Sequence, residues 1–224
     1  YLVPVLNSLV ATWFFLRYLR YGNVIILFYS GFFGALSCLF HQMHFFWWLG
    51  LFAGLIIHRS GFKAVIFYVI PALMVPLVYL FIYLNFLTES YEWEGFIRFV
   101  FRDLFTGTVQ SDFGWINVKM GAISLFRTFL QLHGNMLVLV KSNYFYVVPF
   151  VISVSALVYS LKYLSVPELK LLRKDKVFMT IGLVFLLQFL FAIYSVGNAE
   201  FMVMLPFLAV IMTAYSTKPA IRWA

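Results

Sequence analysis

Long apolar runs alternate with short polar joints along the whole chain. Seven runs consist almost only of hydrophobic side chains, and they cover 1–16, 23–40, 44–57, 64–87, 144–164, 177–196 and 201–215. A helix that crosses a bilayer needs roughly 20 such residues. The pattern therefore predicts an all-α fold, a polytopic membrane helix bundle with about seven transmembrane helices, in a single transmembrane domain over 1–224.

The segment 88–143 between the fourth and fifth runs has a different pattern. Glu94, Arg98 and Arg102 follow one another at i, i+4 and i+8, with mostly apolar residues between them. This spacing predicts an amphipathic helix over 94–105 that lies on the bilayer surface. A second amphipathic helix is predicted over 116–134, where Gly134 ends it.

Several residues inside the apolar runs predict how the helices pack. Gly31, Gly34 and Ser37 form a stripe of small residues, which is typical of closely packed membrane helices. Pro71 lies in the fourth run, where we expect it to bend the helix. Gln188 lies deep in its run, and a hydrogen bond to another helix is favoured over a role in ligand binding.

Composition strengthens the membrane interpretation. Of the 224 residues, 64% are hydrophobic and 11% are charged, and the mean hydropathy is +0.95. Soluble domains are about half apolar and a quarter charged. The net charge of +8 would suggest nucleic acid in a soluble protein. Here the basic residues lie between apolar runs, so we expect membrane lipids as partners, with protein partners open, and no nucleic acid.

The distribution of the basic residues predicts an orientation. Most of the 16 Lys and Arg residues fall in alternate joints, and the joints between them are poorer in basic residues. The positive-inside rule then places 165–176 and the C-terminus in the cytoplasm and 88–143 on the extracytoplasmic side. Because the chain begins at Tyr1 within an apolar run, we expect it to be part of a longer protein.

Three hydrogen-bonding residues interrupt the apolar sequence between the second and third runs. His41, Gln42 and His44 lie in a turn on the predicted outer side. Polar side chains at membrane depth tend to be functional, but a histidine also caps a helix end or extends toward the headgroups. Both interpretations remain open. No third ligand is close in sequence, so no metal site is predicted.

Two further groups of polar residues are candidates for substrate binding. Asn198 and Glu200 precede the last run, where they form either a tight turn or one wall of a substrate cavity. Arg98 and Arg102 meet lipid phosphates in general or form a dedicated clamp on a phosphorylated lipid. The chain has no Walker motif, GxSxG or HExxH, so soluble nucleotide chemistry is not supported.

Two segments resemble the GT-C superfamily of integral membrane glycosyltransferases. "GFFGALSCLFHQMHFFWWLGLFAGLI" is similar to that superfamily's small-residue helix, polar turn and short helix, and "GNAEFMVMLPFLAVIM" is similar to its late Leu-Pro helix. The resemblance implies transfer of a sugar from a polyprenyl-phosphate donor on the extracytoplasmic face. It also implies that the chain is a C-terminal portion of such an enzyme.

The resemblance assigns roles to individual residues and also leaves one role unfilled. It implies substrate contacts for the residues of the turn, of the amphipathic helix and of the last joint: His41, Gln42, His44, Arg98, Arg102, Asn198 and Glu200. It leaves room for a divalent cation. Members of the superfamily carry a catalytic carboxylate in the first outer loop, which this chain lacks. We therefore expect that residue upstream, with Asp103 and Asp112 as weaker candidates.

Two other classes of function remain open from the sequence. A transporter or flippase of a lipid-linked substrate would explain the kinked helices, but internal repeats and buried charges are not evident. A noncatalytic membrane subunit of a larger complex would explain the large aromatic content, which is 21% of the chain.

Overall fold

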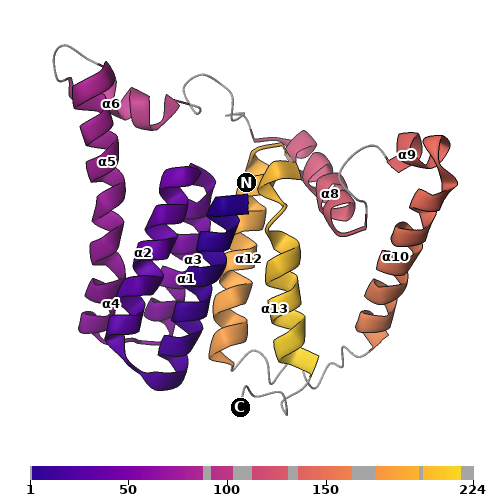
Figure 1. The fold of residues 1–224 in the computed structure, drawn as a ribbon, viewed down its shortest axis with the longest axis horizontal. Helices are drawn as coiled ribbons and strands as arrows, with labels where there is room; N and C mark the ends of the chain where they lie inside the picture. Colours follow the sequence, from indigo (N-terminus) through magenta and orange to yellow (C-terminus); the bar gives the residue numbers. More distant parts are fainter. Residues whose placement is uncertain are drawn as a thin grey trace. The chain divides into compact units, whose positions relative to one another are not determined.

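The computed structural model describes residues 2–87, 92–102, 113–130, 136–162, 175–196 and 199–217. Regular structure in these ranges is entirely helical (Figure 1). The α-helices are α1 Leu2–Tyr21, α2 Val24–Phe40, α3 Phe45–Ile57, α4 Phe62–Val69, α5 Met74–Ile82, α6 Trp93–Val100, α8 Trp115–Leu130, α9 Met136–Ser142, α10 Val147–Lys162, α12 Lys176–Tyr194 and α13 Leu205–Thr217. Short 3-10 segments are η1 Gln42–His44, η2 Ile70–Leu73, η4 Tyr144–Tyr146 and η5 Ala199–Phe201, and η3 Tyr83–Leu87 is a π-helix.

Each of the seven apolar runs forms helix, which confirms the predicted all-α fold. The two amphipathic segments are helical as well, as α6 and α8. The first of them ends at Val100, where Phe101 leaves the helical conformation, and so is shorter than the predicted 94–105. The predicted end of the second helix at Gly134 lies outside the described residues.

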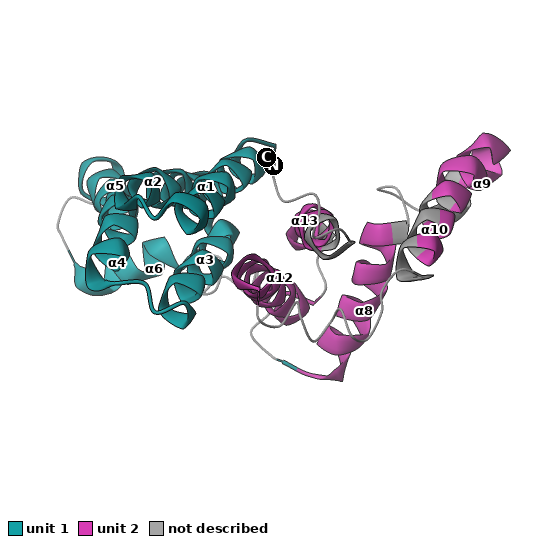
Figure 2. Cartoon of the chain, turned by 90° about the horizontal axis from the view of Figure 1, so that it is seen from below, with its two compact units in different colours: residues 1–113 teal, residues 114–224 magenta. Residues whose placement is uncertain are grey.

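The described residues pack into two compact units, 1–113 and 114–224 (Figure 2). The single transmembrane domain that the sequence pattern predicts over 1–224 stays a prediction. Unit 1 contains α1 to α6, and unit 2 contains α8 to α13.

The core of unit 1 forms where α2 packs against α1, α3 and α4. Gly22 has a φ of +71° and lets the chain reverse after α1, and the side chain of Asn23 caps α2 by accepting the N–H of Ile25. Gly31 lies directly against the backbone of Tyr68 in α4, so that a Cβ atom at Gly31 would overlap the Tyr68 carbonyl oxygen. This contact confirms the predicted close packing along the small-residue stripe.

The fourth apolar run is interrupted at Pro71, as predicted. Pro71 lies within η2, which separates α4 from α5, because proline lacks the N–H that an α-helix needs at that point. Farther along, the run ends in the π-helix η3, where Tyr83 is buried. Single π-turns within helices frequently mark functional sites.

Unit 2 is built around α12. Asp175 caps this helix by accepting the backbone N–H groups of Val177 and Phe178. The helix packs against α13 and α8. The side-chain amide of Gln188 donates to the carbonyl of Phe201 in η5 over 3.3 Å, which confirms the hydrogen bond between elements predicted for this residue.

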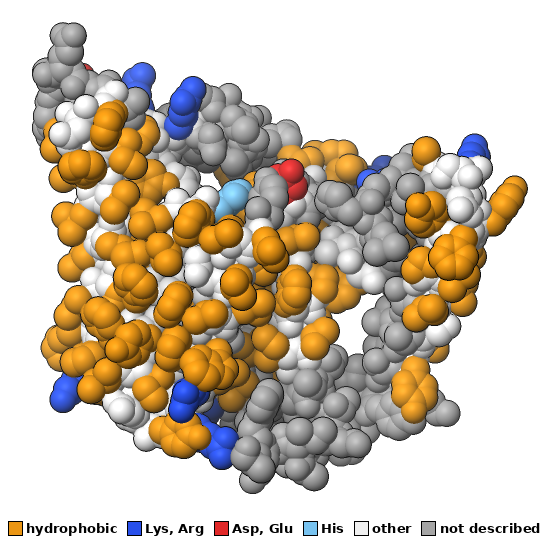
Figure 3. Space-filling model, viewed as in Figure 1, with side chains coloured by type: hydrophobic (Ala, Val, Ile, Leu, Met, Phe, Trp, Pro, Cys, Tyr) orange, Lys and Arg blue, Asp and Glu red, His pale blue; other side chains and the backbone are white. Residues whose placement is uncertain are grey.

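Three described helical stretches are long and apolar enough to cross a membrane: Leu2–Tyr21, Phe62–Phe86 and Lys176–Tyr194. Two shorter apolar stretches, Val24–Phe40 and Gln42–Ile57, lie between the first two. Hydrophobic side chains cover much of the surface seen in Figure 3. A chain with such helices and such a surface has the character of a membrane protein.

Candidate functional site at the turn between α2 and α3

The turn between α2 and α3 sends its polar side chains to different elements. His41 ends α2 in an extended conformation, and its N–H bonds to the carbonyl of Ser37. The following three residues form η1 and lead directly into α3. The predicted site residues of this turn therefore share a backbone segment. The side chain of His44 contacts α1, whereas that of Gln42 contacts α5 and α6.

His44 is bound into the interface with α1. Its Nδ1 lies 2.7 Å from the hydroxyl of Ser8, which lies 2.8 Å from the hydroxyl of Ser37. Ser37 donates to the carbonyl of Pro4 over 2.6 Å. Each hydroxyl has a single proton, so the last bond fixes the direction of the whole chain. Ser8 donates to Ser37, and the Nδ1 of His44 carries the proton donated to Ser8.

A second chain of hydrogen bonds runs beside the first. The indole N–H of Trp47 donates to the hydroxyl of Thr12 over 2.8 Å, and Thr12 donates to the carbonyl of Ser8 over 2.9 Å. The ring of His44 stacks on that of Trp47, with the centroids 6.3 Å apart. Buried polar groups that are satisfied in this way fix a unique packing of helices.

The distance between Ser8 and His44 is one that a nucleophile and its general base also show. Both residues are only 1% exposed, and the proton of Ser8 is already donated to Ser37. The geometry therefore gives the pair a role in holding α1, α2 and α3 together. A substrate contact of His44 stays a prediction.

Gln42 is exposed. Its side-chain amide donates to the hydroxyl of Tyr79 in α5 and to the carbonyl of Val100, both over 2.9 Å. Val100 is the last residue of α6, and the last carbonyls of a helix have no partner within it. Gln42 thus caps α6 and connects it to the turn.

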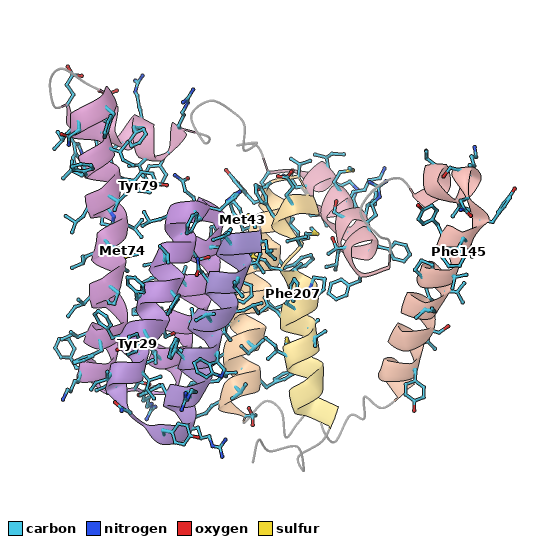
Figure 4. All side chains as sticks on the ribbon, in the orientation of Figure 1. Tyr29, Met43, Met74, Tyr79, Phe145 and Phe207 are labelled. Atoms are coloured by element: carbon cyan, nitrogen blue, oxygen red, sulfur yellow. The ribbon has the colours of Figure 1, made fainter. Side chains whose placement is uncertain are left out.

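Aromatic side chains support α6 from below (Figure 4). Phe99 contacts the ring of Tyr79 at 5.8 Å between centroids, and Phe96 contacts Tyr83 edge to face at 5.6 Å. The hydroxyl of Tyr83 donates to the carbonyl of Glu92 over 3.2 Å. The π-helix η3 therefore supplies Tyr83, whose side chain packs against α6.

The two arginines of the predicted site lie at this joint and are exposed. Arg98 pairs with Glu94 over 2.7 Å, with the side chains 68% and 76% exposed. An ion pair with this exposure contributes little to stability. Arg98 therefore keeps most of its donors available for a phosphate, and Arg102 lies four residues farther along the chain, just beyond the end of α6.

The structure thus brings together part of the predicted site. His41 and Gln42 lie beside the C-terminal end of α6, which carries Arg98 and ends two residues before Arg102. Glu200 is exposed in η5 of unit 2. Three other predicted residues, Asp103, Asp112 and Asn198, lie outside the described residues.

Sequence reasoning missed three residues of this region. Ser8 and Thr12 have the i, i+4 spacing of one helix face within an apolar run, and this was the available signal. Tyr79 lies in a uniformly apolar segment, and nothing in its neighbourhood distinguishes it.

The described residues offer little elsewhere for a ligand. Within them, no group of three or more His, Cys, Asp or Glu side chains lies close enough to hold a metal ion. A shallow apolar pocket of about 560 Å³ lies on α10, where Val154, Ser155, Val158 and Tyr159 line it. It contains none of the predicted site residues.

Comparison of the chain with models of known protein families, with curated proteins and with solved structures gives no match.

Replacing Gln42 with alanine is expected to loosen α6, because it removes the bond to the Val100 carbonyl and the bond to Tyr79 that anchors the Gln42 side chain to α5. Tyr79→Phe removes only one of the two and should have a smaller effect. Hydrogen exchange of the α6 amides measures this, and we expect a rise of roughly ten-fold for Gln42→Ala, or about 1 to 1.5 kcal/mol. Unchanged exchange would contradict the capping role of Gln42.

Proposed function

We propose that the chain is part of an integral membrane glycosyltransferase that takes a sugar from a polyprenyl-phosphate donor on the extracytoplasmic face. Two features support the proposal. One is the resemblance of 31–56 and 197–212 to segments of the GT-C superfamily. The other is the joint between the polar turn and α6, which carries Arg98 and is followed by Arg102.

The single observation that carries the proposal is the pair of hydrogen bonds made by Gln42. The bond to Val100 holds the C-terminal end of α6 against the turn at 41–44, and the bond to Tyr79 ties the turn to α5. The exposed side chains of Arg98 and Arg102 and the imidazole of His41 then lie on neighbouring backbone segments that are fixed to each other. A fixed set of donors is what a phosphate leaving group requires, because preorganised donors stabilise developing charge without reorganisation.

The chemistry divides between bond cleavage and proton transfer. The bond between the sugar C1 and the phosphate oxygen breaks, and the phosphate keeps the electron pair. Arg98 and Arg102 bind that phosphate, and His41 lies beside it. The acceptor hydroxyl forms the new bond to C1 and loses its proton to a carboxylate. Asp103 and Asp112 are candidates for that base, and Asn198 and Glu200 are candidates for sugar contacts.

The proposed orientation agrees with the order of elements in unit 1. The joints after α1 and after α3 lie at one end of the unit, and the turn at 41–44 and α6 lie at the other (Figure 1). The first end holds Arg17, Arg20, Arg59 and Lys63. We assign this end to the cytoplasm and the α6 end, with 88–143, to the extracytoplasmic side. The segment 165–176 and the C-terminus are then cytoplasmic.

A second candidate is a noncatalytic membrane subunit. It is favoured by the burial of His44, which serves packing among α1, α2 and α3. In that case α6 would meet lipid phosphates without selecting a particular lipid.

Binding of a polyprenyl phosphate to the detergent-solubilised chain distinguishes the two candidates. The matched probe is the same polyprenol without its phosphate. We expect tight binding only of the phosphorylated lipid, and a loss of ten-fold or more in affinity for Arg98→Gln/Arg102→Gln. Glu94→Gln frees Arg98 from its ion pair and should strengthen binding slightly. Equal binding of both lipids, or a double variant that binds like the parent, would reject the proposed donor site.

A further inference from the structure

The end of unit 1 opposite α6 carries a second basic surface that the proposed function does not use. It contains Arg17 and Arg20 in the last two turns of α1 and Arg59 and Lys63 around the α3–α4 joint. All four side chains are exposed. We call this set the basic end. Figure 3 shows Lys and Arg side chains at the end of unit 1 that lies lowest in that view.

Aromatic rings hold the cations of the basic end. The guanidinium carbon of Arg17 lies 4.8 Å from the ring centroid of Trp13 and 5.7 Å from that of Tyr21. Arg20 lies 5.3 Å from the same Tyr21 ring. The two rings are themselves 52% and 56% exposed. Cations in this position keep their hydrogen-bond donors directed away from the protein.

No described carboxylate of unit 1 neutralises this surface. In the described part of unit 1 the acidic residues are Glu92 and Glu94, and both belong to the region of α6 at the opposite end. The positive charge of the basic end is therefore left for a partner outside unit 1.

The backbone conformation of Arg59 is a second observation on the basic end. The N–H of Ser60 bonds to the carbonyl of Leu55, and the N–H of Arg59 bonds to that of Ile56. This pattern is the Schellman motif, in which glycine normally occupies the left-handed position. Here Arg59 occupies it with a φ of 52°. A non-glycine residue in this conformation is a reason to ask whether its side chain has a function.

We propose that the basic end is a binding site for the phosphodiester headgroups of anionic phospholipids. Exposed Trp and Tyr rings beside Arg side chains, at the ends of apolar helices, match the boundary between headgroups and acyl chains. The apolar rings occupy the acyl side of that boundary, and the arginine donors bind the phosphate. A free anion in water would use the cations but not the rings.

Lipid retention by the purified full chain tests the site. The chain is extracted in detergent, equilibrated with equal amounts of phosphatidylglycerol and phosphatidylcholine, and analysed for bound lipid by mass spectrometry of the intact complex. The parent protein should retain phosphatidylglycerol in clear excess. Arg17→Gln/Arg20→Gln should lower that preference by roughly 25-fold, since each basic residue near a charged lipid surface contributes about a five-fold factor.

A matched variant removes two positive charges elsewhere. Lys119 and Lys141 are exposed in unit 2, and Lys119→Gln/Lys141→Gln should keep most of the preference. The proposal is overturned if the parent shows no preference for phosphatidylglycerol, or if this control loses as much as the arginine variant.

Arg59→Gly separates lipid binding from folding. Glycine relieves the left-handed backbone, so this variant should melt at the same temperature as the parent or higher. Its preference for phosphatidylglycerol should nevertheless fall several-fold, whereas Arg59→Lys should retain most of it. A stable Arg59→Gly protein with unchanged lipid preference would show that Arg59 does not belong to the site.

Discussion

Replacing Gly31 with alanine is expected to destabilise the chain by about 3 kcal/mol, because overpacking of a close contact cannot relax easily. The added Cβ atom would overlap the carbonyl oxygen of Tyr68, and its next neighbours are also backbone atoms of that residue. A rigid backbone cannot rotate away as a flexible side chain does. The helices α2 and α4 would therefore have to move apart. Unfolding in a titration from mild detergent into SDS measures the change.

Gly182 offers the matched control, since it also lies inside an apolar helix. A Cβ atom there would meet only the Cε of Met212, at 3.9 Å, which is an ordinary contact. Gly182→Ala should therefore stabilise α12 by up to about 1 kcal/mol through its higher helix propensity. Equal, small effects of both substitutions would contradict the close packing of α2 against α4.

Replacing Ser8 with alanine is the second change with a large expected effect. It leaves the buried Nδ1 proton of His44 without an acceptor and removes the donor to Ser37. An orphaned buried donor costs about 1 to 3 kcal/mol, so we expect a loss near 2 kcal/mol in the same titration. Adding His44→Leu removes the orphaned donor, and the double variant should be no less stable than Ser8→Ala alone.

Ser195 gives the control for this series. It is 9% exposed, and the described residues provide no hydrogen-bond partner for its hydroxyl. Ser195→Ala should therefore be neutral or slightly stabilising. Strictly additive losses from Ser8→Ala and His44→Leu would show that the two side chains do not share the hydrogen bond.

The sequence predicted those features that depend on local periodicity. The apolar runs, the break at Pro71 and the small-residue stripe at Gly31 all follow from spacing along one helix. The amphipathic helix α6 follows from the spacing of Glu94, Arg98 and Arg102 for the same reason. Each of these predictions uses residues within a few turns of one another.

Features that depend on distant residues were beyond prediction. Gln42 contacts Tyr79 and Val100, which lie 37 and 58 positions away. Whether a polar side chain in a turn faces a neighbouring helix or a substrate depends on the conformation of η1, and no local pattern determines it. The sequence therefore left two interpretations open for His44, and the structure shows it buried against Ser8.

The most direct test of the account is a density map of the chain in a lipid nanodisc with a bound polyprenyl phosphate. The account predicts phosphate density within hydrogen-bond reach, about 3 Å, of the guanidinium of Arg98 or Arg102 and beside the turn at 41–44. A phosphate bound elsewhere, with only acyl chains along α6, would contradict the proposed donor site.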